Sequence, residues 1–192
     1  MSRKVILYIA QSLDGFIADS AGSVDWISGD DRHYEGDYGY SDFINGIDTV
    51  IIGYKTYRQI LDELSPGKWM YDDLKSYVLT NPDCEDTENI KFVKTQLPVL
   101  MNALKHQDGK DIWICGGADV LNQCVRENLI DRYIITTVPV ILGAGIRLFA
   151  KNGVAARLKW KDVKTENELS HESEAAFFHI IRFFFYLQSR RQ

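Results

Sequence analysis

The stretch DIWICGGADV, residues 111–120, joins an apolar run to two glycines and then to a helical pattern. The apolar run is typical of a strand that is covered on both faces of a sheet. The glycines let the backbone pass close to a ligand, and the helix beyond them offers free N–H groups to a phosphate. A tight turn that needs glycine for its dihedral angles has the same sequence. The stretch predicts a strand, a turn and a helix, and leaves both interpretations of the turn open.

Similar units occupy most of the chain, because strand-like and helical patterns alternate along it. We expect strands at 5–10, 49–53, 76–80, 90–93, 111–115, 133–141, 158–164 and 176–187. We expect helices at 54–64, 97–105 and 118–127. Residues 16–18 extend the first strand or pair beside it, and residues 30–45 form a loop that runs into a short helix. This order predicts one α/β domain over residues 1–192, with three αβα layers and a mostly parallel sheet whose C-terminal edge strands are antiparallel.

The composition is that of a globular protein with one core. Of the 192 residues, 45% are hydrophobic and 26% are charged, and the formal net charge is −5. Binding to the phosphates of nucleic acid needs a basic face, so we expect no nucleic-acid partner. No apolar run reaches the roughly 20 residues of a membrane helix, so we expect no membrane contact. Acids follow the basic N-terminus closely, which favours a first strand over a signal peptide.

The cysteines and histidines predict neither a disulfide nor a metal site. Three cysteines are an odd number without CxxC spacing, and two of them lie in apolar segments, as buried free thiols do. The histidines have no metal-ligand spacing with one another or with cysteine; they are His33, His106, His171 and His179. This usage favours a reduced, cytoplasmic chain.

Two further strand ends carry residues that suit a nucleotide. Lys55 and Thr56 follow the run at 49–53, and Thr80 and Asn81 close the run at 76–80. The first of these ends is not a P-loop, because the glycine-to-lysine spacing and the required first glycine are both wrong. The GxGxxG fingerprint of ordinary dinucleotide-binding folds is also absent from the sequence. Three such ends at one edge of a sheet outline a groove of dinucleotide size.

Residues nearer the N-terminus suit a substrate pocket. The turn signal Asp14–Gly15 lies inside an apolar stretch, which marks a loop over a pocket or a simple bulge. Asp25 stands beside the indole of Trp26, and several further aspartates follow. We expect most of these aspartates to be solvated surface acids, because a buried carboxylate needs a partner.

Four motifs follow the order and spacing of a known superfamily. They are SLDGFIA at 12–18, Gly53-x-x-Thr56-Tyr57, CGG at 115–117 and PVILGAGIRLF at 139–149. In these motifs the chain resembles the dihydrofolate reductase-like superfamily. More narrowly, it resembles the C-terminal reductase domain of bifunctional riboflavin-biosynthesis proteins and its stand-alone bacterial relatives. The motifs are specific for fold and cofactor, and much less specific for substrate.

The resemblance implies an NADPH-dependent reductase that transfers a hydride to a C=N bond of a small pterin- or pyrimidine-like molecule. The implied cofactor-binding residues are Ala10, Ile17, Gly53, Tyr54, Lys55, Thr56, Leu79, Thr80, Asn81, Cys115, Gly116, Gly117, Ala118, Asp119 and Val120. The implied substrate-binding residues are Asp14, Phe16, Gly143, Gly145 and Arg147, with Arg147 as the clear candidate to hold a substrate phosphate. The catalytic candidates are Asp25, Trp26 and Asp37, of which Trp26 fits the family's pocket tryptophan.

One departure from the family leaves alternatives open. The family usually has arginine after the glycine at position 53, contacting the 2′-phosphate of NADPH, whereas this chain has Tyr54. Lys55 supplies only a point charge, so NADH is not excluded. The alternatives are the riboflavin-pathway 5-amino-6-(5-phosphoribosylamino)uracil reductase and, from another class, a non-catalytic nucleotide-binding or sensor protein with this fold.

The aromatic run at 177–186 bears on assembly. It is apolar on both strand faces, which indicates either a central strand or an edge strand that a second subunit buries. We expect a homodimer built with the C-terminal strands.

Overall fold

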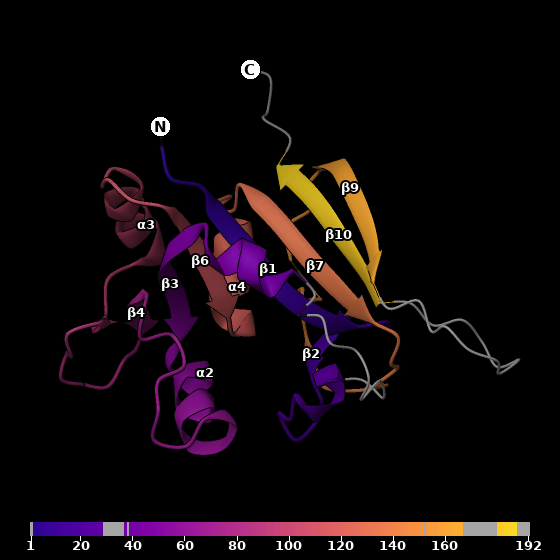
Figure 1. Ribbon diagram of the computed structural model, residues 1–192, viewed down its shortest axis with the longest axis horizontal. Coiled ribbons are helices and arrows are strands. Elements are labelled where there is room, and N and C mark those ends of the chain that lie inside the picture. Colours follow the sequence, from indigo (N-terminus) through magenta and orange to yellow (C-terminus); the bar gives the residue numbers. More distant parts are fainter. Residues whose placement is uncertain (1, 29–36, 38, 152, 167–179, 188–192) are drawn as a thin grey trace, which may run out of the picture.

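Figure 1 shows a computed structural model of the chain, which describes residues 2–28, 37, 39–151, 153–166 and 180–187. Its strands are β1 (Val5–Ser12), β2 (Phe16–Ala18), β3 (Ile47–Gly53), β4 (Lys75–Leu79), β5 (Ile90–Val93), β6 (Asp111–Gly116), β7 (Arg132–Val138), β8 (Ile146–Arg147), β9 (Leu158–Glu166) and β10 (Ile180–Leu187). Its helices are α1 (Tyr40–Ile44), α2 (Tyr54–Gln59), α3 (Leu97–Lys105) and α4 (Ala118–Arg126), with the short helical turns η1 (Asp25–Ser28) and η2 (Ile60–Leu64). Within these described ranges, no helix is long and apolar enough to span a bilayer.

A sheet of eight strands forms the middle of the molecule, in the order β5-β4-β3-β6-β1-β7-β10-β9. The six strands from β5 to β7 are parallel, whereas β10 is antiparallel to both β7 and β9. The predicted mostly parallel sheet with antiparallel C-terminal edge strands is therefore confirmed. Within the aromatic run, the central-strand interpretation is right for residues 180–186, because β10 lies between β7 and β9 while β9 forms the edge (Figure 1). Residues 176–179 of the predicted strand lie outside the described part of the chain.

Helices cover both faces of this sheet and complete the three predicted layers. Alternation along β1 sends Leu7 to one face and Ile6 to the other. On the first face, Leu7 lies in a buried cluster with Leu104 of α3 and Leu121 of α4. On the second face, Ile6 lies in a cluster that Phe43 of α1 covers, and α2 packs beside it. The helical pattern predicted at 54–64 is divided between α2 and the π-helical turn η2.

A second, two-stranded sheet stands beside the large one. The predicted run at 16–18 is a strand, but it pairs with β8 rather than with β1. Gly15, with a φ of 86°, turns the chain between β1 and β2. Gly145 has no space for a side chain, because a Cβ atom there would overlap the carbonyl oxygen of Ala18. The two strands can approach each other because glycine stands at this position.

The guanidinium of Arg3 ties the start of β1 to β3 and to the loop before β6. Arg3 is buried, forms an ion pair with Asp48 and donates a hydrogen bond of 2.6 Å to Oγ1 of Thr49. Its Nε donates a bond of 2.6 Å to the carbonyl oxygen of Lys110. These contacts fix the amino ends of three neighbouring strands, and hence the register of their carboxyl ends.

Candidate functional site

The carboxyl ends of four neighbouring strands meet along one edge of the sheet. The strands β4, β3, β6 and β1 are adjacent in that order. In the sheet register, Gly53 lies beside Leu79, and Ile52 lies beside Gly116. The strand ends that the sequence singled out separately therefore lie side by side. This edge is where open α/β sheets bind their ligands.

The turns that follow β3 and β6 touch each other. A Cβ atom on Gly117 would stand 2.7 Å from Oγ1 of Thr56, and one on Gly53 would stand 3.2 Å from Cγ2 of Val120. Glycine at these two positions therefore allows the turns to pack. Helix α4 begins at this contact without a side-chain cap, so its first backbone N–H groups are not satisfied by its own N-cap residue. Such a helix start suits a phosphate.

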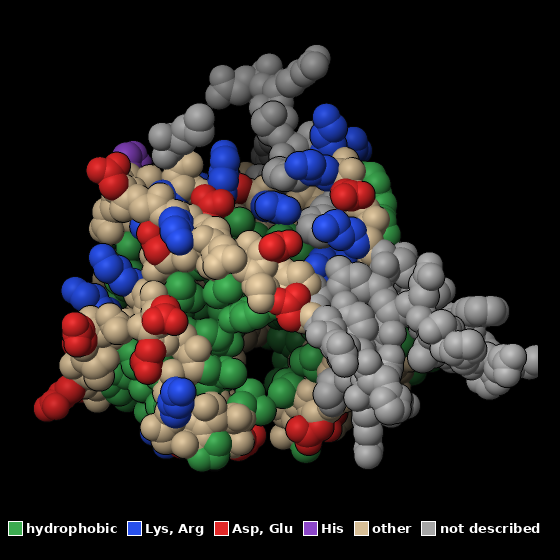
Figure 2. Space-filling model, in the orientation of Figure 1, with side chains coloured by type: hydrophobic (Ala, Val, Ile, Leu, Met, Phe, Trp, Pro, Cys, Tyr) green, Lys and Arg blue, Asp and Glu red, His purple; other side chains and the backbone are tan. Residues whose placement is uncertain are grey.

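Figure 2 shows the surface hollowed below its centre, with hydrophobic side chains around the hollow. In Figure 1 the same place lies between α2 and β2. The groove predicted at the carboxyl edge therefore has an apolar wall, as sites for flat cofactor rings usually do.

The other cofactor candidates on this edge differ in exposure. Tyr54 is half-buried, and its ring centre lies 6.2 Å from that of Tyr57. Lys55 is exposed, which leaves its ammonium group in solvent at the start of α2. Thr80 is buried, while the neighbouring Asn81 is exposed. Ala118 is half-buried and Asp119 is exposed at the start of α4.

The environment of the Cys115 thiol disfavours its thiolate form. Its Sγ atom lies 4.0 Å from the hydroxyl oxygen of Tyr71, and burial raises its pKa to about 12. The thiolate is the reactive form, and a pKa this high keeps it scarce. In the described part of the chain, no three metal-ligating side chains form a cluster; His33, His171 and His179 lie outside that part.

Three residues predicted near the reacting atoms lie at different places. Ala10 is half-buried near the end of β1. Ile17 of β2 packs against the cluster on the α3 and α4 face of the sheet. Trp26 lies in η1, and its Nε1 atom is buried without a hydrogen-bond partner among the residues that the structure describes. A buried N–H group in this state costs about 1–3 kcal/mol, which a bound molecule or water would recover.

The two candidate carboxylates are both on the surface. Asp37 accepts hydrogen bonds from the backbone N–H groups of Gly39, at 2.8 Å, and Ser41, at 2.7 Å. Bonds from Ser41 lower the pKa of Asp37, so this carboxyl is ionised at neutral pH and holds the start of α1. Asp25 is exposed at the start of η1, and its backbone N–H donates to Oγ of Ser23 at 3.1 Å.

The residues predicted to bind substrate gather around the small sheet. Asp14 accepts hydrogen bonds from Oγ of Ser12, at 2.7 Å, and from the N–H of Gly143, at 2.7 Å. The bond from Ser12 is the largest cause of the lowered pKa of Asp14. Across β2 and β8, Cζ of Arg147 lies 4.5 Å from the ring centre of Phe16, in a cation–π contact. The structure thus brings Asp14, Phe16, Gly143 and Arg147 together with Gly145. The guanidinium of Arg147, however, lies against an aromatic ring.

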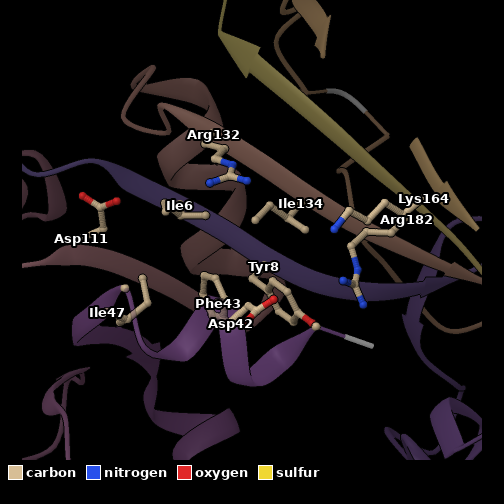
Figure 3. Close-up of a pocket in the computed structure, with 12 residues that line it drawn as sticks. Ile6, Tyr8, Asp42, Phe43, Ile47, Asp111, Arg132, Ile134, Lys164 and Arg182 are labelled. Atoms are coloured by element: carbon tan, nitrogen blue, oxygen red, sulfur yellow. The ribbon is translucent and has the colours of Figure 1, made fainter. Parts of the chain in front are cut away.

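A cleft of about 220 Å³ lies on the face that α1 covers, and the sequence analysis did not predict it. Figure 3 shows that Tyr8, Phe43 and Ile134 line it together with three basic side chains, Arg132, Lys164 and Arg182. The rings of Tyr8 and Phe43 stack with centres 4.2 Å apart. One signal could have revealed the cleft, because Arg182 interrupts an otherwise apolar strand.

The mixed sheet with helices on both faces has the fold of the dihydrofolate reductase-like class of α/β proteins, which solved structures share. Within that class, the chain belongs to the RibD C-terminal domain family, a family of reductase domains, whose sequence profile matches residues 3–169.

Individual relatives agree with this assignment. The chain is 43% identical over 165 residues to the uncharacterised YwjB protein of Bacillus subtilis, covering 85% of this chain and 92% of that protein. A proposed riboflavin biosynthesis protein from Shewanella sp. PV-4 is 25% identical, with a TM-score of 0.78 and coverage of 98% and 99%. Dihydrofolate reductase from Enterococcus faecalis, complexed with NADP(H), is 12% identical and shares the fold, with a TM-score of 0.65 and coverage of 97% and 99%.

Proposed function

We propose that the chain is a cytoplasmic NADPH-dependent reductase, which transfers a hydride to a C=N bond of a small pterin- or pyrimidine-like molecule. The observation that carries this proposal is the contact between Gly117 and Thr56, which joins two βα turns into one backbone cradle beside the end of β1. The NADP(H) bound to the Enterococcus dihydrofolate reductase supports the same cofactor here. The free cysteines agree with a reducing compartment.

We infer that a dinucleotide binds along this edge. The N–H groups at the start of α4 are the proposed contacts to the pyrophosphate, and the exposed Lys55 is the proposed contact to the 2′-phosphate. Ala10 has a small side chain that permits a flat ring to lie against β1. When bound, a reduced nicotinamide supplies the hydride.

Reduction of a C=N bond adds the hydride to carbon and a proton to nitrogen. Asp37 is ionised and bonded to the start of α1, so it is a poor source of that proton at neutral pH. We assign the buried N–H of Trp26 to positioning, through a hydrogen bond to the substrate or to an ordered water. Asp25, exposed beside it, is the remaining carboxylate candidate.

Binding and turnover are tested separately. NADPH and NADH are titrated against the intrinsic fluorescence of the protein, and cofactor oxidation is followed at the nicotinamide absorbance with a panel of dihydropterins and pyrimidine imines. The proposal expects binding of NADPH and oxidation with at least one member of the panel. Binding without oxidation across the panel supports the non-catalytic nucleotide-binding alternative, and absence of binding overturns the proposal.

The variant Trp26→Phe tests the positioning role, because it keeps a ring and removes the N–H group. We expect kcat/KM to fall about ten-fold, the value of one hydrogen bond, with the cofactor Kd unchanged. An unchanged kcat/KM contradicts the assignment.

The riboflavin-pathway reductase is the second candidate, favoured by membership of the RibD C-terminal domain family. The substrate of that reductase carries a phosphate. Arg147 of β8 is exposed and lies over the ring of Phe16 of β2. Oxidation of NADPH with 5-amino-6-(5-phosphoribosylamino)uracil, lost in Arg147→Gln, would establish this activity. No oxidation with that compound, beside activity with other imines, would exclude it.

We also propose a homodimer that uses the C-terminal strands. The edge strand β9 exposes 53% of Trp160, whose ring centre lies 5.4 Å from that of Phe185 on β10. An exposed aromatic residue on an edge strand favours pairing with a second chain. Sedimentation should give a dimer mass that Trp160→Glu reduces, while Val154→Glu, another exposed apolar position, leaves it unchanged. A monomer mass for the unmodified protein would contradict this proposal.

A further inference from the structure

Four contacts join the segments around the proposed cofactor groove into a closed ring. Helix α2 touches the start of α4 through the turn contact described above. Helix α4 holds the segment after β8, because Oδ1 of Asn122 accepts a hydrogen bond of 2.8 Å from the N–H of Ala150. Strand β8 pairs with β2, and the loop beyond β2 returns to α2. The hollow in Figure 2 lies between two members of this ring, α2 and β2 (Figure 1).

The link that closes the ring is a hydrogen bond from one side chain. Nε2 of Gln59, the last residue of α2, donates this bond of 2.7 Å to the carbonyl oxygen of Gly22. The same nitrogen lies 3.4 Å from Oε2 of Glu63, so both N–H groups of the amide have an acceptor. Gln59 is half-buried, which limits the competition of water for the bond. The bond therefore ties a helix of the cofactor edge to the loop on the opposite side of the groove.

The next link of the ring, from α4 to the segment after β8, is held by several interactions. Asn122 also donates hydrogen bonds to the carbonyl oxygens of Ala118, at 2.7 Å, and Leu148, at 3.4 Å. Leu148 is fully buried, and beyond it β8 is joined to β2 by strand pairing. The bond of Gln59 is thus the link that one substitution removes without disturbing a strand pair or a fully buried side chain.

The loop beyond β2 is a compact unit. Oδ1 of Asp19 accepts hydrogen bonds from the N–H groups of Ala21, at 2.8 Å, and Ser23, at 2.9 Å. The N–H of Asp19 donates to the carbonyl oxygen of Ser23 at 3.0 Å, and Gly22 lies inside the turn that these bonds close. Trp26 follows in η1. A bond to the carbonyl oxygen of Gly22 therefore also influences where the indole of Trp26 is held.

We propose that Gln59 is a positioning residue of the reductase: its bond to Gly22 fixes the loop that carries Trp26 relative to α2, and so fixes the indole N–H relative to the bound cofactor. This inference rests on the proposed function, which puts the cofactor along this edge and gives the indole N–H its role. Hydrogen bonds weaken steeply with misalignment, and a misplacement of about 1 Å costs up to about 100-fold in rate. Loss of the Gln59 bond thus acts on turnover through the Trp26 loop.

Two substitutions of Gln59 separate the donor from the rest of the side chain. Gln59→Met keeps the length and the helix propensity and removes the donor, whereas Gln59→Lys keeps a donor. We expect Gln59→Met to lower kcat/KM about five- to ten-fold for the panel member that the protein reduces, with the Kd for NADPH changed less than about two-fold. Gln59→Lys should recover most of this loss. Gln123→Met, at a half-buried glutamine of α4, is the control and should retain full activity.

A double variant tests whether Gln59 acts through Trp26. In the Trp26→Phe protein the N–H group is absent, so its placement no longer matters for turnover. Adding Gln59→Met should then lower kcat/KM by less than about two-fold, whereas the two losses multiply if the residues act independently. A purely structural role predicts a lower melting temperature with equal losses of kcat/KM in both backgrounds, and circular dichroism of each variant measures that temperature.

Hydrogen exchange of the unliganded protein tests the contact without cofactor or substrate. Exchange in peptides that cover residues 19–28 should be faster in Gln59→Met than in the unmodified protein, because the loop is released from α2. Gln59→Lys should restore the slow exchange, and Gln123→Met should leave it unchanged.

Three results would overturn the inference. They are unchanged exchange of residues 19–28 in Gln59→Met, an unchanged kcat/KM in that variant, or an equal loss of kcat/KM with and without Trp26→Phe. Failure of the proposed function looks different, because NADPH is then not bound or not oxidised while the loop still exchanges faster in Gln59→Met; the positioning role falls with it. If NADPH is bound and oxidised but Gln59→Met turns over normally, the positioning role alone is wrong.

Discussion

Gly117 and Thr56 approach each other so closely that one methyl group on the glycine would stand 2.7 Å from the threonine Oγ1. The two residues are 61 positions apart in the chain; Gly117 directly follows β6, and Thr56 lies in the first turn of α2 after β3. Their contact locks the start of α2 to the start of α4. The geometry of the proposed cofactor groove therefore depends on the absence of a side chain at one position.

The first prediction concerns this contact. Gly117→Ala should lower the free energy of unfolding by about 1–3 kcal/mol, because a methyl group has to displace a packed neighbour. NADPH affinity should fall in the same variant, since the turn moves. Adding Thr56→Ala removes the clashing oxygen and should recover part of the stability in a denaturant titration. Full stability of Gly117→Ala, or no recovery in the double variant, would show that the two turns are not in contact.

The second prediction concerns the choice between NADPH and NADH. Lys55 is exposed next to Tyr54, and Tyr54 stands where the resemblance described above led us to expect arginine. Lys55→Gln should weaken NADPH about five-fold, as expected for a solvent-exposed charge contact of roughly 1 kcal/mol, and should leave NADH unchanged. Lys91→Gln, an exposed lysine on β5, provides the control in the same fluorescence titration. Equal changes for the two cofactors would exclude Lys55 as the contact to the 2′-phosphate.

The third prediction compares a buried ion pair with an exposed one. Asp48 pairs with Arg3, whose side chain is 4% exposed, whereas Asp62 pairs with Arg58 on the surface, four residues apart. Asp48→Asn should cost about 2–3 kcal/mol of stability, because it leaves a buried guanidinium without its counter-charge. The same change in Asp62 should cost less than about 0.5 kcal/mol. Similar midpoints for the two variants in urea would show that Arg3 does not anchor the strands.

The fourth prediction is a dependence on pH. Hydrogen bonds to the Asp14 carboxylate hold its pKa below the ordinary value of 3.8. The stabilisation that they give is therefore complete above pH 3.8, and it is lost as the pH falls through the lower native pKa. Hydrogen exchange of the Leu142 and Gly143 amides, which donate to Asp14, should accelerate relative to the rest of the chain over that acid range.

Asp14→Asn supplies the control for this dependence. The variant should abolish the acid-dependent part of the exchange, while Asp73→Asn, at an exposed position, should preserve it. If the two loop amides exchange with the same relative rates at pH 6 and pH 3 in the unmodified protein, the carboxylate does not hold the loop.

Most of the fold could be predicted because its signals are local. The apolar runs at 49–53 and 111–115 can only be strands covered on both faces, and the glycines after them mark the turns. Strand β8 could not be found in this way, since it has two residues and both are exposed. It exists because the Asp14 turn and the loop after β7 hold it opposite β2, and that constraint is invisible in the local pattern.

The shared edge at which the proposed site lies could be predicted for the same reason. The strand ends around Gly53 and Gly116 share one edge once the sheet is parallel, so topology brings them together. The basic cleft depends instead on the register of β10 between β7 and β9, which pairs Arg182 with Thr136 and with Lys164. Register between strands distant in sequence is set by packing of the whole sheet, and no short window of residues specifies it.

The position of β10 has a consequence for the order in which the protein folds during its synthesis. One wall of the cleft comes from residues 180–187, whereas the opposite neighbour of β7 is formed by residues 5–12. Both of these neighbouring strands, β1 and β7, are therefore synthesised before Arg182 can take its place beside Thr136. Nascent chains that have already folded the nucleotide edge still lack this guanidinium, so the basic end of the cleft forms after that edge.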